Sequence, residues 1–302
     1  MSTETVAIVG AGAVGTALAH ALAAAGVPVT AVASRRRAHA DALADRIAGA
    51  RAVALNEAAR SVSVALLTVS DSAIEGACAA LDAPTGVLVA HVSGSRNVTA
   101  LEAARTNGAD VGGMHPLAAV ARGNAPTPPP ESPFDGAVFA IEADDAVADR
   151  LSAIATALGG RPFRIAAGDK PLYHLGASML AAFAAGLAQI SWEQLRRASG
   201  SDTVASHGVA HLLRTVAGNI ERAPEPAAAL TGPAARGDAA GVARQAEAAR
   251  KLSPEAHGLY RAHALHSVAL AQSAGVVTAE AAGQLRAALR QDETTATREG
   301  ET

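Results

Sequence analysis

A glycine-rich segment near the N-terminus carries the clearest chemistry in this 302-residue sequence. Residues 10–15 read Gly10-Ala11-Gly12-Ala13-Val14-Gly15, between a predicted strand, Thr5–Val9, and a predicted helix from Gly12 to Ala25. In that setting the first glycine permits a tight turn, the second lets backbone approach a pyrophosphate, and the third lets the helix pack closely on the strand. The N–H groups and the positive dipole end of the helix would then face phosphate. The segment therefore predicts a dinucleotide site.

The end of the next predicted strand, Val29–Ala33, indicates which dinucleotide binds. An NAD site usually places Asp or Glu there, about 20 residues after the glycines, to bind the ribose 2′-hydroxyl. This chain instead has Ser34 and Arg35, followed by two further arginines. A hydroxyl and a guanidinium suit a 2′-phosphate, because arginine forms charge-assisted bonds to phosphate. A solvated basic helix start is the alternative, and we predict NADP(H) in preference to NAD(H).

Three further predicted strands end in residues that could reach a ligand. Doubly wound folds bind ligands at the carboxyl ends of their parallel strands, so these residues should meet at one edge of the sheet. Val69 and Ser70, at the end of strand 63–69, are predicted beside the cofactor. Ser93 and Gly94, after strand 86–92, and His115, at the end of strand 111–115, are predicted beside the substrate. A structural role is the alternative for any one of them, but their shared edge favours a substrate site.

A lysine heads the first predicted helix of the C-terminal part, residues 170–198. Lys170 is followed one turn later by His174 on the same face. A lysine at a cleft between domains can donate a proton when partial desolvation lowers its pKa. The alternative is a surface lysine near a helix start. We predict Lys170 as a general acid, assisted by His174.

The segment Leu230–Asp238 is unusual within a helical region. Its Thr231, Gly232 and Arg236 could bind a substrate carboxylate at the start of the next helix. An ordinary capped turn is the alternative. The remaining histidine pairs lack a carboxylate or cysteine at ligand spacing, so we predict no metal site.

Composition excludes several classes of protein. The chain has 25 basic and 28 acidic side chains and a net charge of −3, which gives no electrostatic case for nucleic acid. Its one cysteine, Cys78, excludes an intramolecular disulfide, and we expect a cytoplasmic protein. Residues 5–34 lack charged side chains, but glycines and Pro28 divide them into short pieces, so we expect neither a membrane span nor a signal peptide.

The order of the predicted elements indicates the fold class. Strands alternate with helices up to Ile165, which predicts an α/β Rossmann domain with a doubly wound, mostly parallel sheet. After Ile165 only helices are predicted. We therefore expect a dinucleotide-binding domain at residues 1–167, an all-helical substrate and dimerisation domain at 168–292, and a frayed tail at 293–302. The Pro-rich stretch Ala125–Pro133 is predicted to be an exposed loop.

The predicted helical domain is rich in alanine and leucine on several helix faces. Some of that apolar surface needs a partner, so we expect a homodimer. The helix predicted at 254–273, with Leu259, Tyr260, Leu265 and Leu270, is the candidate interface.

These motifs together resemble those of Rossmann-like oxidoreductases that carry a C-terminal DUF2520 domain. The resemblance runs from about Thr5 to about Leu270. Its pieces are GAGAVG at 10–15, HVSGS at 91–95, GMHPL at 113–117, FAIEAD at 139–144, KPLYH at 170–174 and LTGPAARGD at 230–238. Members usually also have an asparagine about three turns after the lysine, where this chain has Ala182 and Phe183. More distantly, the layout is similar to the superfamily of 6-phosphogluconate dehydrogenase, ketopantoate reductase and pyrroline-5-carboxylate reductase.

The resemblance implies an NADPH-dependent reductase of a small 2-oxo acid, with ketopantoate-like substrates first and the site in the cleft between the domains. Lys170 fits the lysine of the hydroxyacid enzymes, whereas His174 stands where they have asparagine. The serine loop at Ser93 and the His-Pro loop at His115 are similar to those of prephenate dehydrogenases. A prephenate-, arogenate- or imine-type dehydrogenase is therefore an alternative, and a catalytically silent NADP(H)-binding regulator is another.

Overall fold

The computed structural model describes residues 4–120 and 132–299, with side chains described as far as residue 290. It divides into two compact units, residues 1–183 and 184–302. The strands are β1 Val6–Val9, β2 Val29–Ala33, β3 Arg51–Ala52, β4 Val64–Leu67, β5 Leu88–His91, β6 Asp110–Pro116, β7 Val138–Glu142 and β8 Arg161–Arg164. The α-helices are α1 Ala13–Ala24, α2 Arg37–Ala44, α3 Ile74–Ala79, α4 Glu102–Thr106, α5 Asp145–Ala157, α6 Lys170–Ser199, α7 Asp202–Arg222, α8 Ala239–Arg250, α9 Pro254–Ser273 and α10 Ala279–Glu299.

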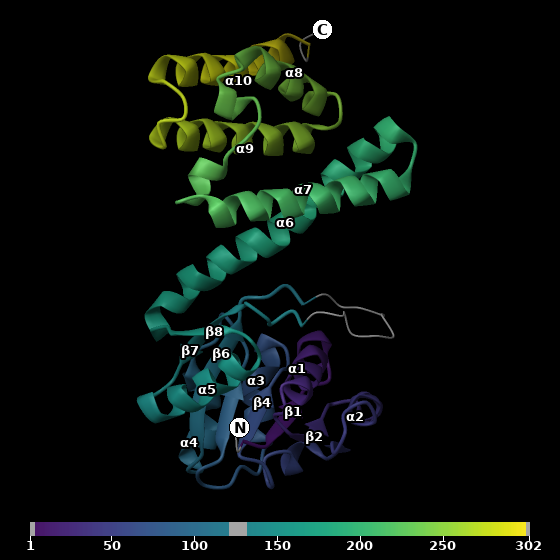
Figure 1. The fold of residues 1–302 in the computed structure, drawn as a ribbon, viewed down its shortest axis with the longest axis vertical. Helices are drawn as coiled ribbons and strands as arrows, with labels where there is room; N and C mark the ends of the chain where they lie inside the picture. Colours follow the sequence, from purple (N-terminus) through teal and green to yellow (C-terminus); the bar gives the residue numbers. More distant parts are fainter. Residues whose placement is uncertain (1–3, 121–131, 300–302) are drawn as a thin grey trace. The chain divides into compact units, whose positions relative to one another are not determined.

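The first unit is built on one eight-stranded sheet of order β3-β2-β1-β4-β5-β6-β7-β8 (Figure 1). All neighbouring strands are parallel except β6 and β7. The chain reverses its direction of winding between β1 and β4, which lie side by side, and doubly wound sheets bind dinucleotides at such a switch point. The predicted α/β fold with a mostly parallel sheet is therefore confirmed.

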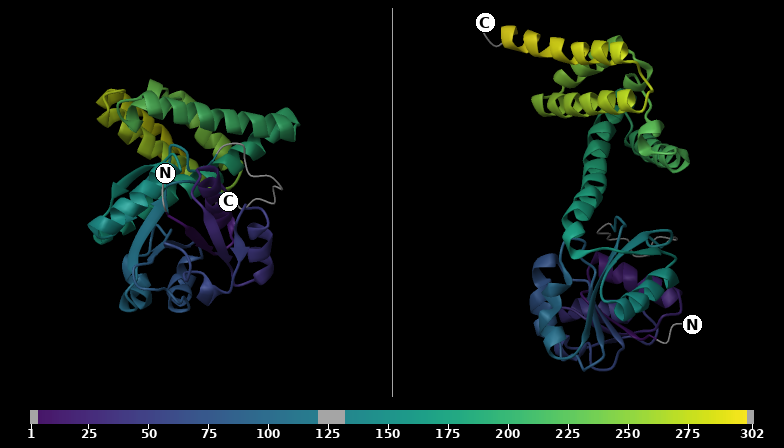
Figure 2. Two further views of the ribbon diagram at one scale, coloured as in Figure 1. Left: turned by 60° about the horizontal axis from the view of Figure 1, so that its bottom comes forward. Right: turned by 90° about the vertical axis from the view of Figure 1, so that its left-hand side faces the viewer.

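Alternation along the strands builds a core on each face of the sheet. Val6 and Ile8 of β1 pack with α1, α2 and α5, whereas Ala7 and Val9 pack with α3 and α4 on the other face. Figure 2 shows the sheet between these layers of helices. The central strands are buried on both faces, which explains their continuous apolar sequences.

Two parts of the chain differ from the sequence-based expectation. The two-residue strand β3 was not predicted, since Arg51-Ala52 carries no β-branched run and is defined only by its pairing with β2. Helix α10 continues to Glu299, into the segment 293–302 that we expected to fray. Most of the predicted Pro-rich loop lies outside the described residues, as do residues 300–302.

In the second unit, α8, α9 and α10 pack around a small apolar core. Val242 of α8, Val268 of α9 and Leu285 of α10 are each at most 1% exposed. From the predicted dimer face on α9, Tyr260 and Leu265 pack against this core, while Leu259 is 45% exposed. Part of the apolar face expected to meet a second chain is thus used within the unit itself.

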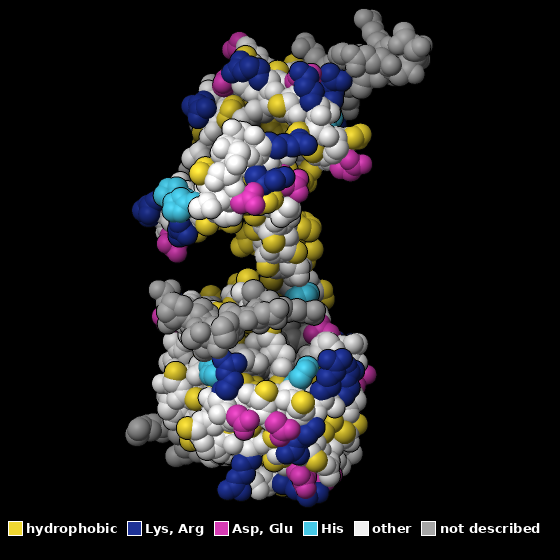
Figure 3. Space-filling model, turned by 90° about the vertical axis from the view of Figure 1, so that its right-hand side faces the viewer, with side chains coloured by type: hydrophobic (Ala, Val, Ile, Leu, Met, Phe, Trp, Pro, Cys, Tyr) yellow, Lys and Arg dark blue, Asp and Glu magenta, His cyan; other side chains and the backbone are white. Residues whose placement is uncertain are grey.

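Helices α6 and α7 expose the larger apolar surface. On α6 the exposed side chains are Leu172, Leu175, Met179, Leu180, Phe183 and Leu187, and on α7 they are Val204, Leu212, Leu213, Val216 and Ile220. Apolar side chains of α6 are visible in Figure 3. The segment Ala167–Ser199 is also long and apolar enough to cross a membrane, by length and composition alone. The core helix of a soluble protein passes the same test when it is mostly buried, whereas the most apolar stretch of this segment is not buried.

Candidate functional site

The glycine-rich turn packs tightly on the residue that follows β4. Thr68 donates a hydrogen bond from Oγ1 to the Gly10 carbonyl at 2.7 Å. A Cβ on Gly15 would lie 1.9 Å from that carbonyl oxygen, and a Cβ on Gly10, whose φ is +120°, would lie 2.8 Å from the Thr68 carbonyl oxygen. Packing therefore requires glycine at both positions.

Gly12 has a different reason to be glycine. It precedes α1, no side chain caps that helix, and no acidic residue lies in its first turn. A Cβ on Gly12 would meet no protein atom within 4 Å, so the space beside the helix N-terminus is left open. Ala11 and Val14 turn toward the core, and Ala13 begins the helix. The turn thus presents its backbone outward and fits a pyrophosphate.

The predicted 2′-phosphate ligands follow β2. Ser34 is half-buried and Arg35 is exposed, and the structure gives the Arg35 guanidinium no partner among the described residues. Arg37 differs, because its guanidinium donates to Asp41 at 2.9 Å and to the carbonyl of Ala52 at 3.1 Å. Of these two arginines, Arg35 is the one available to a phosphate.

The loops after β4 and β5 are bonded to each other. Ser95 donates from its hydroxyl to Asp71 at 2.5 Å. The Ser93 hydroxyl, 7% exposed, accepts from the backbone N–H groups of Ser95 and Arg96 at 3.2 and 3.0 Å. Ser93 therefore organises its own loop. In the loop after β4, Val69 is partly buried and packs against the core, whereas Ser70 is exposed.

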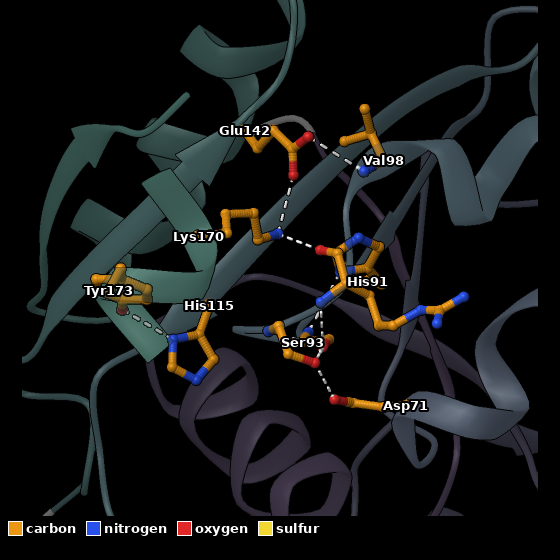
Figure 4. Close-up of polar contacts among 10 residues, drawn as sticks. Asp71, His91, Ser93, Val98, His115, Glu142, Lys170 and Tyr173 are labelled. Atoms are coloured by element: carbon orange, nitrogen blue, oxygen red, sulfur yellow. Dashed lines mark hydrogen bonds and ion pairs between the residues drawn. The ribbon is translucent and has the colours of Figure 1, made fainter. Parts of the chain in front are cut away.

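Three aromatic side chains from β6 and α6 lie together, and the two histidines among them lie over Gly94. The Tyr173 hydroxyl lies 2.8 Å from Nδ1 of His115 (Figure 4). The ring centroids of His115 and His174 are 6.1 Å apart. A Cβ on Gly94 would lie 2.8 Å from Nδ1 of His174 and 2.9 Å from Nε2 of His115. Nδ1 of His174 is buried and has no hydrogen-bond partner among the described residues. Glycine at position 94 allows the two imidazoles to come together.

Lys170 lies in a buried ion pair. Its side chain is 3% exposed, and Nζ donates to Glu142 at 2.9 Å and to the carbonyl of Arg96. The other carboxylate oxygen of Glu142 accepts from the Val98 N–H at 3.2 Å (Figure 4). The first turn of α6 is thereby attached to β7 and to the loop after β5.

Burial and neighbouring charges change the pKa values of His115, His91 and Tyr173. Burial first, and then the charges of His174 and Lys170, lower the pKa of His115 to about 4. Burial and the charge of Lys170 likewise lower the pKa of His91 to about 4, while burial raises the pKa of Tyr173 to about 12. His115 is therefore a neutral imidazole at neutral pH, and Tyr173 is a protonated phenol.

The predicted carboxylate ligands lie in the second unit. Thr231 and Arg236 are exposed, and Gly232 has a φ of +94°. Asp238 caps α8 by accepting from the Gly241 N–H at 2.7 Å, and the structure gives it no ion pair with Arg236. The Arg236 guanidinium has no partner among the described residues, so it is free to bind an anion. Its role in substrate binding remains a prediction.

Sequence reasoning did not single out two residues of the site. Glu142 and Tyr173 lie within the motifs FAIEAD and KPLYH, but nothing in their spacing indicated that they would meet Lys170 and His115. Those contacts span 28 and 58 residues of sequence. Among the described residues, no group of three or more His, Cys, Asp or Glu side chains is placed to hold a metal ion.

Comparison with protein families identifies both parts of the chain. Residues 5–95 match the model described as "NADP oxidoreductase coenzyme F420-dependent", and residues 137–267 match DUF2520, a domain of unknown function. The predicted resemblance to Rossmann-like oxidoreductases with a C-terminal DUF2520 domain, the oxidoreductase class and the NADP(H) cofactor are thereby confirmed. No curated protein matches the chain.

Solved structures share the fold over most of the chain. A Bacteroides fragilis protein, provisionally described as an NADP oxidoreductase, is 22% identical with a TM-score of 0.70, over 88% of this chain and 98% of that one. A pyrroline-5-carboxylate reductase of Coxiella burnetii is 15% identical with a TM-score of 0.58, over 97% and 98%. A reductive aminase of Aspergillus terreus, in complex with NADPH and ethyl-5-oxohexanoate, is 19% identical with a TM-score of 0.55, over 99% and 95%.

We predict that Arg35→Ala lowers the affinity for NADPH about tenfold, because it removes a charge-assisted bond to the 2′-phosphate. The affinity for NADH should stay unchanged. Arg37→Ala is the matched control, since its guanidinium is bound within the protein. Fluorescence titration of each variant with NADPH and with NADH measures the two affinities. An equal loss for NADPH and NADH in Arg35→Ala would contradict the assignment.

We also predict that the free energy of unfolding decreases as the pH is lowered from 6.5 to 5. The pKa values of His91 and His115 are about 4 in the folded chain, well below the ordinary 6.5, so in this range the unfolded chain binds more protons and low pH favours it. Each histidine contributes a slope of up to about 1.4 kcal/mol per pH unit. Stability should become independent of these two groups above about pH 7.5, where the histidines of the unfolded chain are neutral as well.

Urea denaturation at several pH values tests this dependence. His115→Gln should remove part of the slope, whereas His39→Gln, at an exposed position on α2, serves as the matched control. The same slope in wild type and His115→Gln would show that His115 does not remain neutral in the folded chain.

Proposed function

Because this chain joins an NADP oxidoreductase domain to a DUF2520 domain, we propose that it reduces a small 2-oxo acid with NADPH. Ketopantoate-like acids are the first candidates. The observation that carries the proposal is the group of His115, Tyr173, His174 and Lys170. This group lies in the same unit as the dinucleotide turn, beyond the carboxyl end of β5.

Bound NADPH supplies the hydride for the carbonyl carbon. The protein must stabilise the negative charge that develops on the carbonyl oxygen and provide one proton, so that the oxo group becomes a hydroxyl. In the proposed arrangement Nε2 of His115 donates a hydrogen bond to that oxygen. A neutral imidazole can do this at pH 7, whereas a histidine with a pKa near 4 is scarcely ever an imidazolium at that pH.

Lys170 takes a different part from the general acid that the sequence suggested. Its amine is buried and already donates to Glu142 and to the Arg96 carbonyl. We propose that it attaches α6 to β7 through its ion pair with Glu142, with His115 as the proton donor. A Cβ on Gly113, next but one before His115, would lie 3.5 Å from Nζ of Lys170, so this charge is close to the β6 histidine.

A cyclic imine is the second candidate substrate. It is supported by the names of two similar structures, a pyrroline-5-carboxylate reductase and a reductive aminase. Imine reduction uses the same hydride donor, and a protonated imine needs no further proton. The oxo acid stays the first candidate, because His115 offers the proton donor that a carbonyl group needs and a protonated imine does not.

NADPH oxidation by the full-length protein, measured against a panel of 2-oxo acids and cyclic imines, tests the proposed function. We expect turnover with a branched 2-oxo acid and at most slow turnover with imines. Stoichiometric NADPH binding without turnover of any panel member would contradict the proposal and favour an NADP(H)-binding regulator.

Lys170→Met tests the assignment of the proton donor. As a positioning charge, Lys170 should affect both stability and turnover, because the variant leaves Glu142 buried without a cation, at a cost of roughly 3–5 kcal/mol in unfolding free energy. Lys170→Met/Glu142→Gln removes both charges and should recover stability and part of the turnover. If the double variant is as stable as wild type yet loses turnover by about 10²–10⁴-fold, Lys170 is the general acid after all.

We further propose that the chain forms a soluble homodimer through α6 and α7. Leu172 and Leu180 are each 75% exposed and Phe183 is 60% exposed, an apolar surface that a second copy could bury. Light scattering at micromolar concentration should give twice the mass of the chain, and Leu180→Glu should give a monomer. A monomeric wild type, or recovery of the protein only with membranes, would contradict this proposal.

A further inference from the structure

The hydroxyl of Tyr173 is within hydrogen-bond distance of the Nδ1 atom of His115. The two atoms are 2.8 Å apart, and the His115 and Tyr173 rings meet edge-on with centroids 5.5 Å apart. Both side chains are partly buried, so the bond is shielded from solvent on several sides. Because the Tyr173 ring also packs on Phe163, with centroids 5.9 Å apart, its direction is set by two contacts.

We propose that Tyr173 is the residue that sets the tautomer of His115, by donating its hydroxyl hydrogen to Nδ1 and so keeping the imidazole proton on Nε2. This inference rests on the proposed function, because a donor at Nε2 is what the reduction of a carbonyl group requires. Tyr173 does not itself contact the substrate; it positions the proton of the residue that does.

The opposite tautomer would leave the site without its donor. If Nδ1 carried the proton and donated to Tyr173, Nε2 would be an acceptor and would repel a carbonyl oxygen. The nearest second imidazole nitrogen cannot replace it, because Nδ1 of His174 is buried. A tyrosine that donates to Nδ1 removes this alternative, as a hydrogen bond to one ring nitrogen fixes the role of the other.

Tyr173 can also return the proton that the product takes. When Nε2–H passes its proton to the oxygen of the reduced substrate, the hydroxyl proton of Tyr173 passes to Nδ1, so the imidazole remains neutral. A water molecule then protonates Nε2, and Nδ1 returns its proton to the phenolate, so the Nε2–H tautomer is restored with hydroxide as the other product. The net transfer of a proton from the Tyr173 hydroxyl to the alkoxide of the product is favourable, because a phenol is a stronger acid than an aliphatic alcohol.

Nitrogen-15 NMR of histidine-labelled protein reads the tautomer directly, without substrate. The His115 signal is assigned by its loss in His115→Gln. In the wild type at pH 7.5 we expect a neutral ring with the proton on Nε2. In Tyr173→Phe we expect Nδ1 and Nε2 shifts that move toward those of a tautomer mixture. A wild-type ring protonated on Nδ1, or identical shifts in the two proteins, would overturn the inference.

Turnover is the second measurement. Tyr173→Phe should lower kcat by roughly 10- to 100-fold, with the affinity for NADPH unchanged. Tyr260→Phe is the matched control, since the Tyr260 hydroxyl bonds to Gln245 in the second unit. An unchanged kcat in Tyr173→Phe would also overturn the inference. If the wild type reduces no 2-oxo acid, the proposed function fails, while the NMR result still decides what Tyr173 does to His115.

Discussion

The buried ion pair between Lys170 and Glu142 is the interaction on which the arrangement of the site depends. It connects the last residue of β7 to the first residue of α6, at a point where neither side chain is more than 8% exposed. One turn along α6, Tyr173 and His174 then lie beside His115. Since the pair is enclosed and each charge has a further backbone partner, removing one member leaves the other charge unpaired. The position of the two aromatic side chains therefore follows from an electrostatic contact that is not itself part of the chemistry.

A second constraint acts at the other end of the same sheet edge. Gly10 and Gly15 are glycines because the turn, α1 and Thr68 pack without room for a side chain, whereas Gly12 faces open space. The cofactor turn is thus rigid where it meets the protein and accessible where a phosphate would approach. Because each of the three glycines is required for a different reason, their spacing predicts a dinucleotide site more reliably than any single glycine would.

Much of the fold was predictable from the sequence, because strand and helix signals are local. The glycine turn, the run of buried strands and the helix starts at Lys170 and Pro254 all appear where the pattern places them. The sheet edge shared by Ser93 and His115 also followed, since parallel strands end together. The short strand β3 could not be predicted, because its two residues become a strand only by pairing with β2.

The site was less predictable, because its contacts join residues far apart in the sequence. Lys170 was identified as important, but its partner Glu142 and its burial depend on how β7 and α6 approach each other. Likewise Tyr173 reads as an ordinary helix residue until the structure places its hydroxyl on His115. Side-chain chemistry of this kind is decided by packing, which periodicity and spacing do not encode.

A crystal structure with NADPH and a slowly reduced 2-oxo acid would show whether Nε2 of His115 binds the substrate oxygen. We expect the pyrophosphate at the N–H groups of residues 12–15 and the oxo oxygen about 3 Å from Nε2 of His115. An oxo oxygen bound by Lys170, with the Glu142 ion pair broken, would show that Lys170 and not His115 is the donor.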